Sequence, residues 1–320
     1  MVRPSFRTKL LTTMAQILHS FHSPRKPHKN ATSDPPWLKG TLLGLALLFV
    51  AVVLILPLVA VFSEAFRKGI EPFLRTFTDR DALHAIWLTL LVAMISVPLN
   101  LVFGLAASWA IAKHDFPGKS LLITFIDLPF SVSPVISGVV FVLLFGAGGW
   151  FAPMLDSLGL QIIFAVPGIV LATVFVTLPF VARELIPAMQ ADGRDEEQAA
   201  YLLGASGWQI LSKVTLPNVR WALLYGVLLC NARAMGEFGA VSVVSGHIRG
   251  LTNTIPLHVE ILYNEYNFVA AFSMASLLAL LALITLAGKS ILEWRMQQQI
   301  LQKEAERSPD NIPLHQLHQS

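Results

Sequence analysis

The sequence predicts an all-α membrane protein with six transmembrane helices. Of its 320 residues, 54% are hydrophobic and only 13% are charged, whereas soluble domains carry about 25% charged residues. This composition excludes a soluble globule, a disordered chain and a coiled coil. One cysteine and nine scattered histidines argue against a disulfide framework and against a metal site. The positions of the few charges then define each helix.

Four spans are long runs without Lys, Arg, Asp or Glu, and a helix that crosses a bilayer needs about 20 apolar residues. These spans cover about residues 40–63, 85–112, 162–182 and 266–288. Two further runs are long enough but contain charges: 120–145 includes Asp127, and 221–244 includes Arg233 and Glu237. An even number of spans places both termini on one side of the membrane.

Lysine and arginine placement predicts that this side is the cytoplasm, because positive loops stay inside. With the N-terminus inside, inner segments hold 17 of the 23 basic residues and outer segments hold five. Residues 1–37 form a basic polar tail, for which a disordered cytoplasmic segment, a targeting segment and a misplaced start are all open interpretations. Residues 291–320 form a second cytoplasmic tail.

The inner segment 183–220 is far longer than the usual connections of about 4–6 residues. Acidic residues at its start, with Asp195 as the helix cap, predict a short helix that ends at Gly204. A second short helix is expected from Trp208 to near Pro217. The apolar residues of this helix pair either dock a partner protein or lie on the bilayer surface or on other helices.

The residues of this segment resemble the signature loop of permease subunits of bacterial ABC importers. That signature is EAA, three residues, Gly, nine residues and I-x-L-P. Gln198 stands where the family has Glu, and Val214 where it has Ile. The missing charge puts an electrostatic contact in doubt unless Glu197 supplies it. The coupling-loop residues that the resemblance implies are Glu197, Gln198, Ala199, Ala200, Gly204, Ala205, Gly207, Leu216 and Pro217.

Longer stretches over about residues 38–295, such as IDLPFSVSPVISG, are similar to sulfate/thiosulfate permeases of the CysW type. The resemblance implies a type I permease fold over residues 38–290 and a location in the bacterial inner membrane. It implies a pore shared with a second, T-type permease, two copies of a cytoplasmic ABC ATPase and a periplasmic sulfate/thiosulfate-binding protein. ATP and Mg are then used by the partner ATPase, and this chain is expected to be no enzyme and to hold no cofactor. Consistently, the sequence has no GxxxxGK[ST] motif.

Charged side chains inside spans are costly and usually face a bundle interior or an aqueous cavity. Arg233 and Glu237 are four residues apart and share a helix face. Arg233 either provides positive potential along an anion pathway or forms a structural ion pair with Glu237, and the ion pair is preferred. Asp127, ahead of Pro129 and Pro134, is expected to hydrogen-bond backbone groups that the prolines leave free.

Two alternatives to a sulfate permease follow from the same features. A molybdate or tungstate ABC permease would carry a dianion of similar shape and charge. An ion-coupled secondary transporter would show inverted internal repeats, but residues 40–145 and 157–288 show no repeat. In the outer segment 245–266, Gly246, Arg249 and Gly250 either contact the delivering protein or belong to an ordinary loop.

Overall fold

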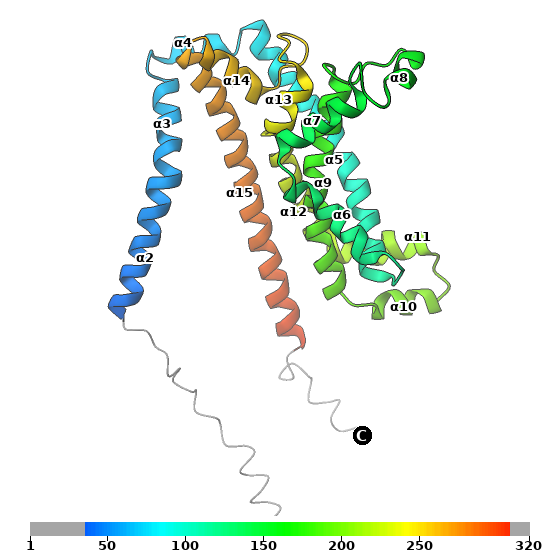
Figure 1. Ribbon diagram of the computed structural model, residues 1–320. Helices are drawn as coiled ribbons and strands as arrows, with labels where there is room; N and C mark the ends of the chain where they lie inside the picture. Colours follow the sequence, from blue (N-terminus) through cyan, green and yellow to red (C-terminus); the bar gives the residue numbers. More distant parts are fainter. Residues whose placement is uncertain (1–35, 308–320) are drawn as a thin grey trace, which may run out of the picture. The chain divides into compact units, whose positions relative to one another are not determined.

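The computed structural model describes residues 36–307, and these fall into two units with the boundary between Pro57 and Leu58. Every regular element within the described residues is a helix, which confirms the all-α prediction (Figure 1). Most of the predicted N-terminal tail, residues 1–35, and the last part of the C-terminal tail, residues 308–320, lie outside the described residues.

A single helix covers the first predicted span, and its membrane-spanning candidate part, Trp37–Ala65, has 29 residues. It consists of α2 (Pro36–Val50), the π-helical turn η1 (Ala51–Ile55) and α3 (Leu56–Ala65). The π turn ends two residues before Pro57. Proline has no N–H to donate and its ring clashes with the carbonyl four residues earlier, so a locally wider turn lets the helix continue.

The second unit contains the other helices. They are α4 (Ile70–Thr76), α5 (Arg80–Lys113), α6 (Lys119–Ser131), α7 (Pro134–Phe145), α8 (Ala152–Leu158), α9 (Val166–Ala191), α10 (Asp195–Leu202), α11 (Gly207–Ile210), the π-helical η2 (Leu211–Thr215), α12 (Leu216–Met235), α13 (Gly239–Ser245), α14 (Ile255–Asn264) and α15 (Phe268–Arg307). By length and composition, α5, α9 and the part of α15 up to Arg295 can each cross a membrane. They cover the second, fourth and sixth predicted spans.

The other two predicted spans are bent. α6 and α7 meet at 107°, so the expectation of one continuous helix over 120–145 is wrong. The break falls at Ser133, whose ψ of 133° is extended, because a following proline disfavours the helical conformation. α12 and α13 meet at 49°. The described residues therefore hold four membrane-spanning candidates, or up to six if each bent pair is one span.

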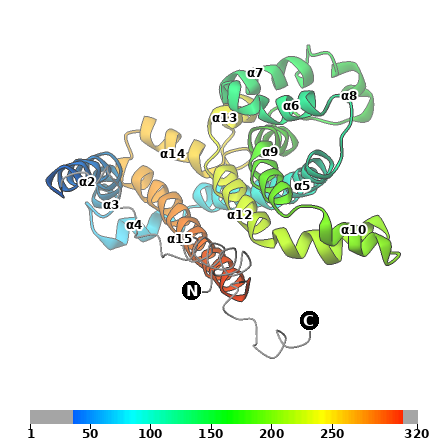
Figure 2. The ribbon, with the colours of Figure 1, turned by 90° about the horizontal axis from the view of Figure 1, so that it is seen from below.

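α9 lies at the centre of the second unit and packs against α5, α6, α7, α12 and α13 (Figure 2). Glycines allow the close approach. A Cβ at Gly104 of α5 would lie 2.7 Å from Cγ1 of Val181, and one at Gly226 of α12 would lie 3.2 Å from the Cα of Val181. Asn100 adds a polar contact, since its Nδ2 donates a hydrogen bond of 2.7 Å to Oγ1 of Thr177. Small residues and interhelical hydrogen bonds are the usual means of helix association in membranes.

Candidate functional site

The loop between α9 and α12 carries α10 and α11 at the end of the second unit opposite α8 and α14 (Figure 1). Arg194, not Asp195, is at the N-cap position of α10, and its side chain forms no capping hydrogen bond, so the prediction that Asp195 caps this helix is wrong. Asp195, Glu196 and Glu197 instead fill the first turn, where acids are favoured by the helix dipole. α10 ends at a turn in which Gly204 has φ of +87°, a conformation that glycine adopts without strain.

The second helix of the loop does not end near Pro217 as predicted. A capping box between Ser206 and Gln209 starts α11, and the helix then runs without interruption from Gly207 to Met235. The π turn η2 precedes Pro217 in the same way that η1 precedes Pro57. The loop is therefore continuous with the span α12, and a displacement of α11 is a displacement of α12.

A buried polar cluster fixes α10 to two other elements. Nζ of Lys113, the last residue of α5, lies 3.1 Å from Oε1 of Glu197 and donates a hydrogen bond to the carbonyl oxygen of Gly193. Oγ1 of Thr215 in η2 donates to the same Glu197 oxygen at 2.6 Å. The Glu197 side chain is only 14% exposed, so one carboxylate connects α5, α10 and η2.

A second, more exposed contact joins the start of α10 to α12. Nδ2 of Asn218 donates to Oε2 of Glu196 at 2.7 Å and to Oδ2 of Asp192 at 3.1 Å. Both contacts use the acidic residues at the beginning of the loop. Glu196 and Glu197 of α10 thus contact other parts of the protein and hold the loop in place.

The apolar residues of the loop face away from the bundle. Tyr201, Leu202, Leu203 and Trp208 are all strongly exposed, with Leu203 at 90%, whereas Ile210 and Leu211 are buried. These four exposed residues form an apolar strip. Exposed apolar groups that are held on a fixed support are typical of a protein-docking surface.

The predicted coupling-loop residues differ in how exposed they are. Gln198 and Ala199 are exposed, Ala200 and Ala205 are half-buried, and Gln198 lines a cavity of about 550 Å³ with Trp109, Lys113 and Tyr201. Glu197 is engaged with Lys113 in this structure. Lys113, Thr215 and Asn218 were not predicted from the sequence, because nothing in their local pattern distinguishes them.

Arg233 and Glu237 lie at the break between α12 and α13. Nη1 of Arg233 is 2.7 Å from Oε2 of Glu237, and the two side chains are 34% and 1% exposed. The other carboxylate oxygen of Glu237 accepts a hydrogen bond from the backbone N–H of Ala240 at 3.0 Å. A cation at the end of α12 and an anion at the start of α13 compensate the dipoles of the two helix ends.

Asp127 of α6 has a different partner from the one predicted. Its Oδ1 accepts a hydrogen bond of 2.8 Å from Nε of Arg183 in α9, and the Arg183 guanidinium stacks over the ring of Phe130. The expectation that Asp127 bonds backbone groups left free by the prolines is therefore wrong. The carboxylate binds a cation 56 residues away, a pairing that local sequence does not indicate.

Short exposed connections contain further pairs. Between α5 and α6, Lys119 donates to Asp115 at 3.0 Å, and this hydrogen bond lowers the pKa of the Asp115 carboxyl. In the outer segment 245–266, Arg249 forms an ion pair with Glu265. Arg249 is one of the residues predicted as a possible contact for the delivering protein. Burial lowers the pKa of His258 in α14.

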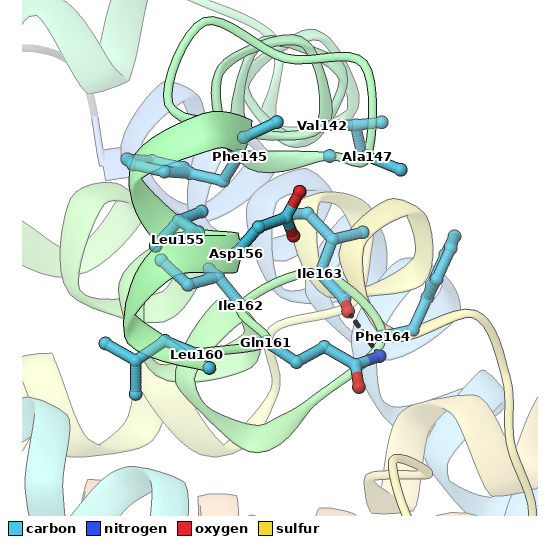
Figure 3. Close-up of a pocket in the computed structure, with 13 residues that line it drawn as sticks. Val142, Phe145, Ala147, Leu155, Asp156, Leu160, Gln161, Ile162, Ile163 and Phe164 are labelled. Carbon is cyan, nitrogen blue, oxygen red and sulfur yellow. Dashed lines mark hydrogen bonds between the residues drawn. The ribbon is translucent and has the colours of Figure 1, made fainter.

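A pocket of about 490 Å³ lies between the end of α7, α8 and the segment before α9. Figure 3 shows the carboxylate of Asp156 pointing into it, while Nε2 of Gln161 is used by a hydrogen bond to the carbonyl of Ile163. The other lining groups are largely apolar. A carboxylate that faces an apolar pocket disfavours a bound anion, so this pocket is not assigned to an anionic substrate.

Comparison with known proteins identifies the family. Residues 100–298 match the family described as "Binding-protein-dependent transport system inner membrane component". The chain is 54% identical to the sulfate transport system permease protein CysW of Escherichia coli K12, over 82% of this chain and 90% of that protein. The chain belongs to the CysW-type permeases of this family.

Two further similarities are consistent with this family. The sulfate transport system permease protein CysT of the same organism is 32% identical, over 81% of this chain and 94% of that protein. A crystal structure of a bacterial alginate ABC transporter, in complex with an alginate-bound periplasmic protein, has a TM-score of 0.69 at 17% identity, over 81% of this chain and 95% of the matched chain. This CysW-type chain thus has the fold of an ABC importer permease and is a multi-pass inner-membrane protein.

Proposed function

We infer that the chain is a permease subunit of an ATP-driven ABC importer that moves sulfate across the inner membrane. The single observation that carries the mechanism is the apolar strip on α10 and α11, held in place by buried and half-buried polar contacts. High identity to a sulfate transport permease over most of the chain supports sulfate as the substrate, and nothing favours molybdate or tungstate. Thiosulfate is proposed as a second substrate because it has the same charge and a similar shape.

The proposed assembly pairs this subunit with a T-type permease, two copies of an ABC ATPase and a periplasmic binding protein. Similarity to CysT supports a pair of related permeases, and the alginate transporter structure includes a periplasmic protein. In the proposed topology both termini and the loop 183–220 are cytoplasmic, and each bent helix pair counts as one of six spans. The ATPase then docks on the apolar strip, and its ATP-driven closure moves α11 and α12 as one body.

The test is reconstitution of the purified complex in vesicles. We expect the chain to co-purify with the ATPase, and ATP hydrolysis to increase when sulfate-loaded binding protein is added. Binding protein without sulfate is the control and should stimulate hydrolysis less. Sulfate transport by this chain alone, without ATP or an ATPase, would contradict the proposal.

A further inference from the structure

α5 ends in a buried lysine. Lys113 is only 8% exposed, although lysine side chains at helix ends normally extend their ammonium group into water. Its position in the last turn of α5 is favourable for a cation, but that does not require burial. Burial of an ammonium group needs specific partners, and the structure shows them on a distant part of the chain.

The partners of Lys113 lie at the start of α10. Its ammonium group donates to the carbonyl of Gly193, 80 residues along the chain, and lies 3.1 Å from Glu197. Gly193 forms the turn between α9 and α10 with φ of +74°, which glycine adopts freely. Lys113 therefore binds both the turn that leads into α10 and the first turn of the helix itself.

This contact connects α10 to a span that does not adjoin it in sequence. α10 is joined along the chain to α9 and to α12, and the Asn218–Glu196 contact again connects α10 to α12. The ion pair of Lys113 with Glu197 connects α10 directly to α5. α9 and α12 also pack on α5, so the Lys113 contact adds a direct polar connection from α10 to α5 to these indirect ones.

Stability alone explains the buried pair poorly. Desolvation of two charges offsets most of their attraction, and apolar residues of similar volume often stabilise a protein equally well. What the ion pair provides, and an apolar contact does not, is a fixed geometry between Nζ and one carboxylate oxygen that is also bound by Thr215. The pair thus fixes the orientation of α10 relative to both α5 and η2.

We propose that Lys113 is a positioning residue for energy coupling, which joins the docked loop to α5 so that α5 and α12 move together. The proposal rests on the proposed function, because α10 must first dock the ATPase. α5 then responds to ATP-driven closure through a direct contact with α10, together with α12. Packed helices that move as rigid bodies are a known means of transmitting small displacements.

The test uses the full complex in vesicles and measures sulfate uptake and ATP hydrolysis together. The double variant Lys113→Met/Glu197→Met removes both charges at similar volume and leaves neither group buried without its partner. We expect it to assemble with wild-type yield, while uptake per ATP hydrolysed falls about tenfold, within the roughly 5–150-fold range of coupling between sites. Lys119→Met, which breaks the exposed pair with Asp115, is the matched control and should leave this ratio unchanged.

Glu197→Gln gives a milder second variant, because an amide oxygen still accepts the hydrogen bond from Thr215. We expect its uptake per ATP to fall about threefold, since a charge-assisted contact is roughly twice as strong as a neutral one. An unchanged ratio in Glu197→Gln, or in an assembled double variant, would overturn the proposal. Uncoupling in Lys113→Met that is fully restored in the double variant would overturn it as well, because the pair would then serve folding only.

Failure of the proposed function would give a different result. A wild-type complex that lacks the ATPase, or that takes up sulfate without ATP, would contradict the function before any variant is made. A coupled wild-type complex with coupled variants would contradict only the role of Lys113.

Discussion

Truncation of the two most exposed leucines of the apolar strip should weaken ATPase binding without unfolding the chain. Leu202 and Leu203 are 85% and 90% exposed, so their outer carbons contribute little to the packing of the subunit. The variant Leu202→Ala/Leu203→Ala should therefore change the free energy of unfolding by less than about 0.5 kcal/mol, as is usual for exposed positions.

The expected loss of affinity follows from the carbons removed. Each Leu→Ala change deletes three carbons, and burial of each is worth about 0.8 kcal/mol, so full burial at the interface gives about 2 kcal/mol for each leucine. The two together contribute about 4 kcal/mol if fully buried and about 2 kcal/mol if half-buried. The Kd for the ATPase should therefore rise between about 30-fold and about 1,000-fold.

The assay is titration of the ATPase onto the permease pair in nanodiscs. Leu251→Ala is the matched control, because Leu251 is 62% exposed but lies in the segment before α14. It should leave the Kd unchanged. An unchanged Kd for the double variant would refute docking through the apolar strip. If the variant instead weakened binding of the loop to lipid vesicles, the loop would be a membrane-surface element.

Three other predictions concern packing, the buried ion pair and pH. Gly104→Ala places a Cβ 2.7 Å from Cγ1 of Val181, so it should lower the free energy of unfolding in detergent by about 1–3 kcal/mol. Gly288→Ala is the control, because the nearest atom to its Cβ is 3.8 Å away, and it should be neutral or stabilising by up to about 1 kcal/mol. Equal effects of the two substitutions would contradict the packing argument. Arg233→Gln leaves Glu237 buried without its cation, so Tm should fall, while sulfate uptake per assembled complex should stay at the wild-type level; loss of uptake in assembled complex would instead support an anion-pathway role. Because burial lowers the pKa of His258, the unfolded chain binds the proton more readily. Its contribution to stability is therefore present above the ordinary pKa of about 6.5 and lost as pH falls below it, so Tm should be lower at acidic pH, and His258→Gln should reduce that dependence.

Composition and charge spacing were sufficient to predict the helical class and the positions of the long helices. The break ahead of Pro134 was not predictable in the same way, because proline is compatible with both a kinked and a broken membrane helix. Tertiary contacts favour the break here. α7 packs on α13 so closely that a Cβ at Gly138 would lie 2.8 Å from the carbonyl oxygen of Ala240. A contact between segments about 100 residues apart is not visible in the local pattern.

In the candidate site, too, local features were predictable from the sequence and contacts between distant segments were not. The acidic start of α10 and the turn at Gly204 follow from local preferences for helix ends, and both were predicted. The side chains that bind those acids were not, since Lys113 and Thr215 come from separate helices. Similarly, Asp127 has prolines nearby in sequence but finds its partner, Arg183, on α9. Local sequence shows that a charge needs a partner, whereas only the fold shows which partner it has.

The charges within the spans have a common arrangement that bears on anion transport. Asp127 in the third span is paired with Arg183, and Arg233 with Glu237, so each of these charges has an oppositely charged partner. The start of α13, where a helix dipole would attract an anion, is occupied by the Glu237 carboxylate through the N–H of Ala240. A sulfate that passes this break would meet a neutral pair and an occupied helix end. We therefore expect no tight anion site at the break, as the proposed function requires of a pore that releases the dianion after a binding protein has delivered it.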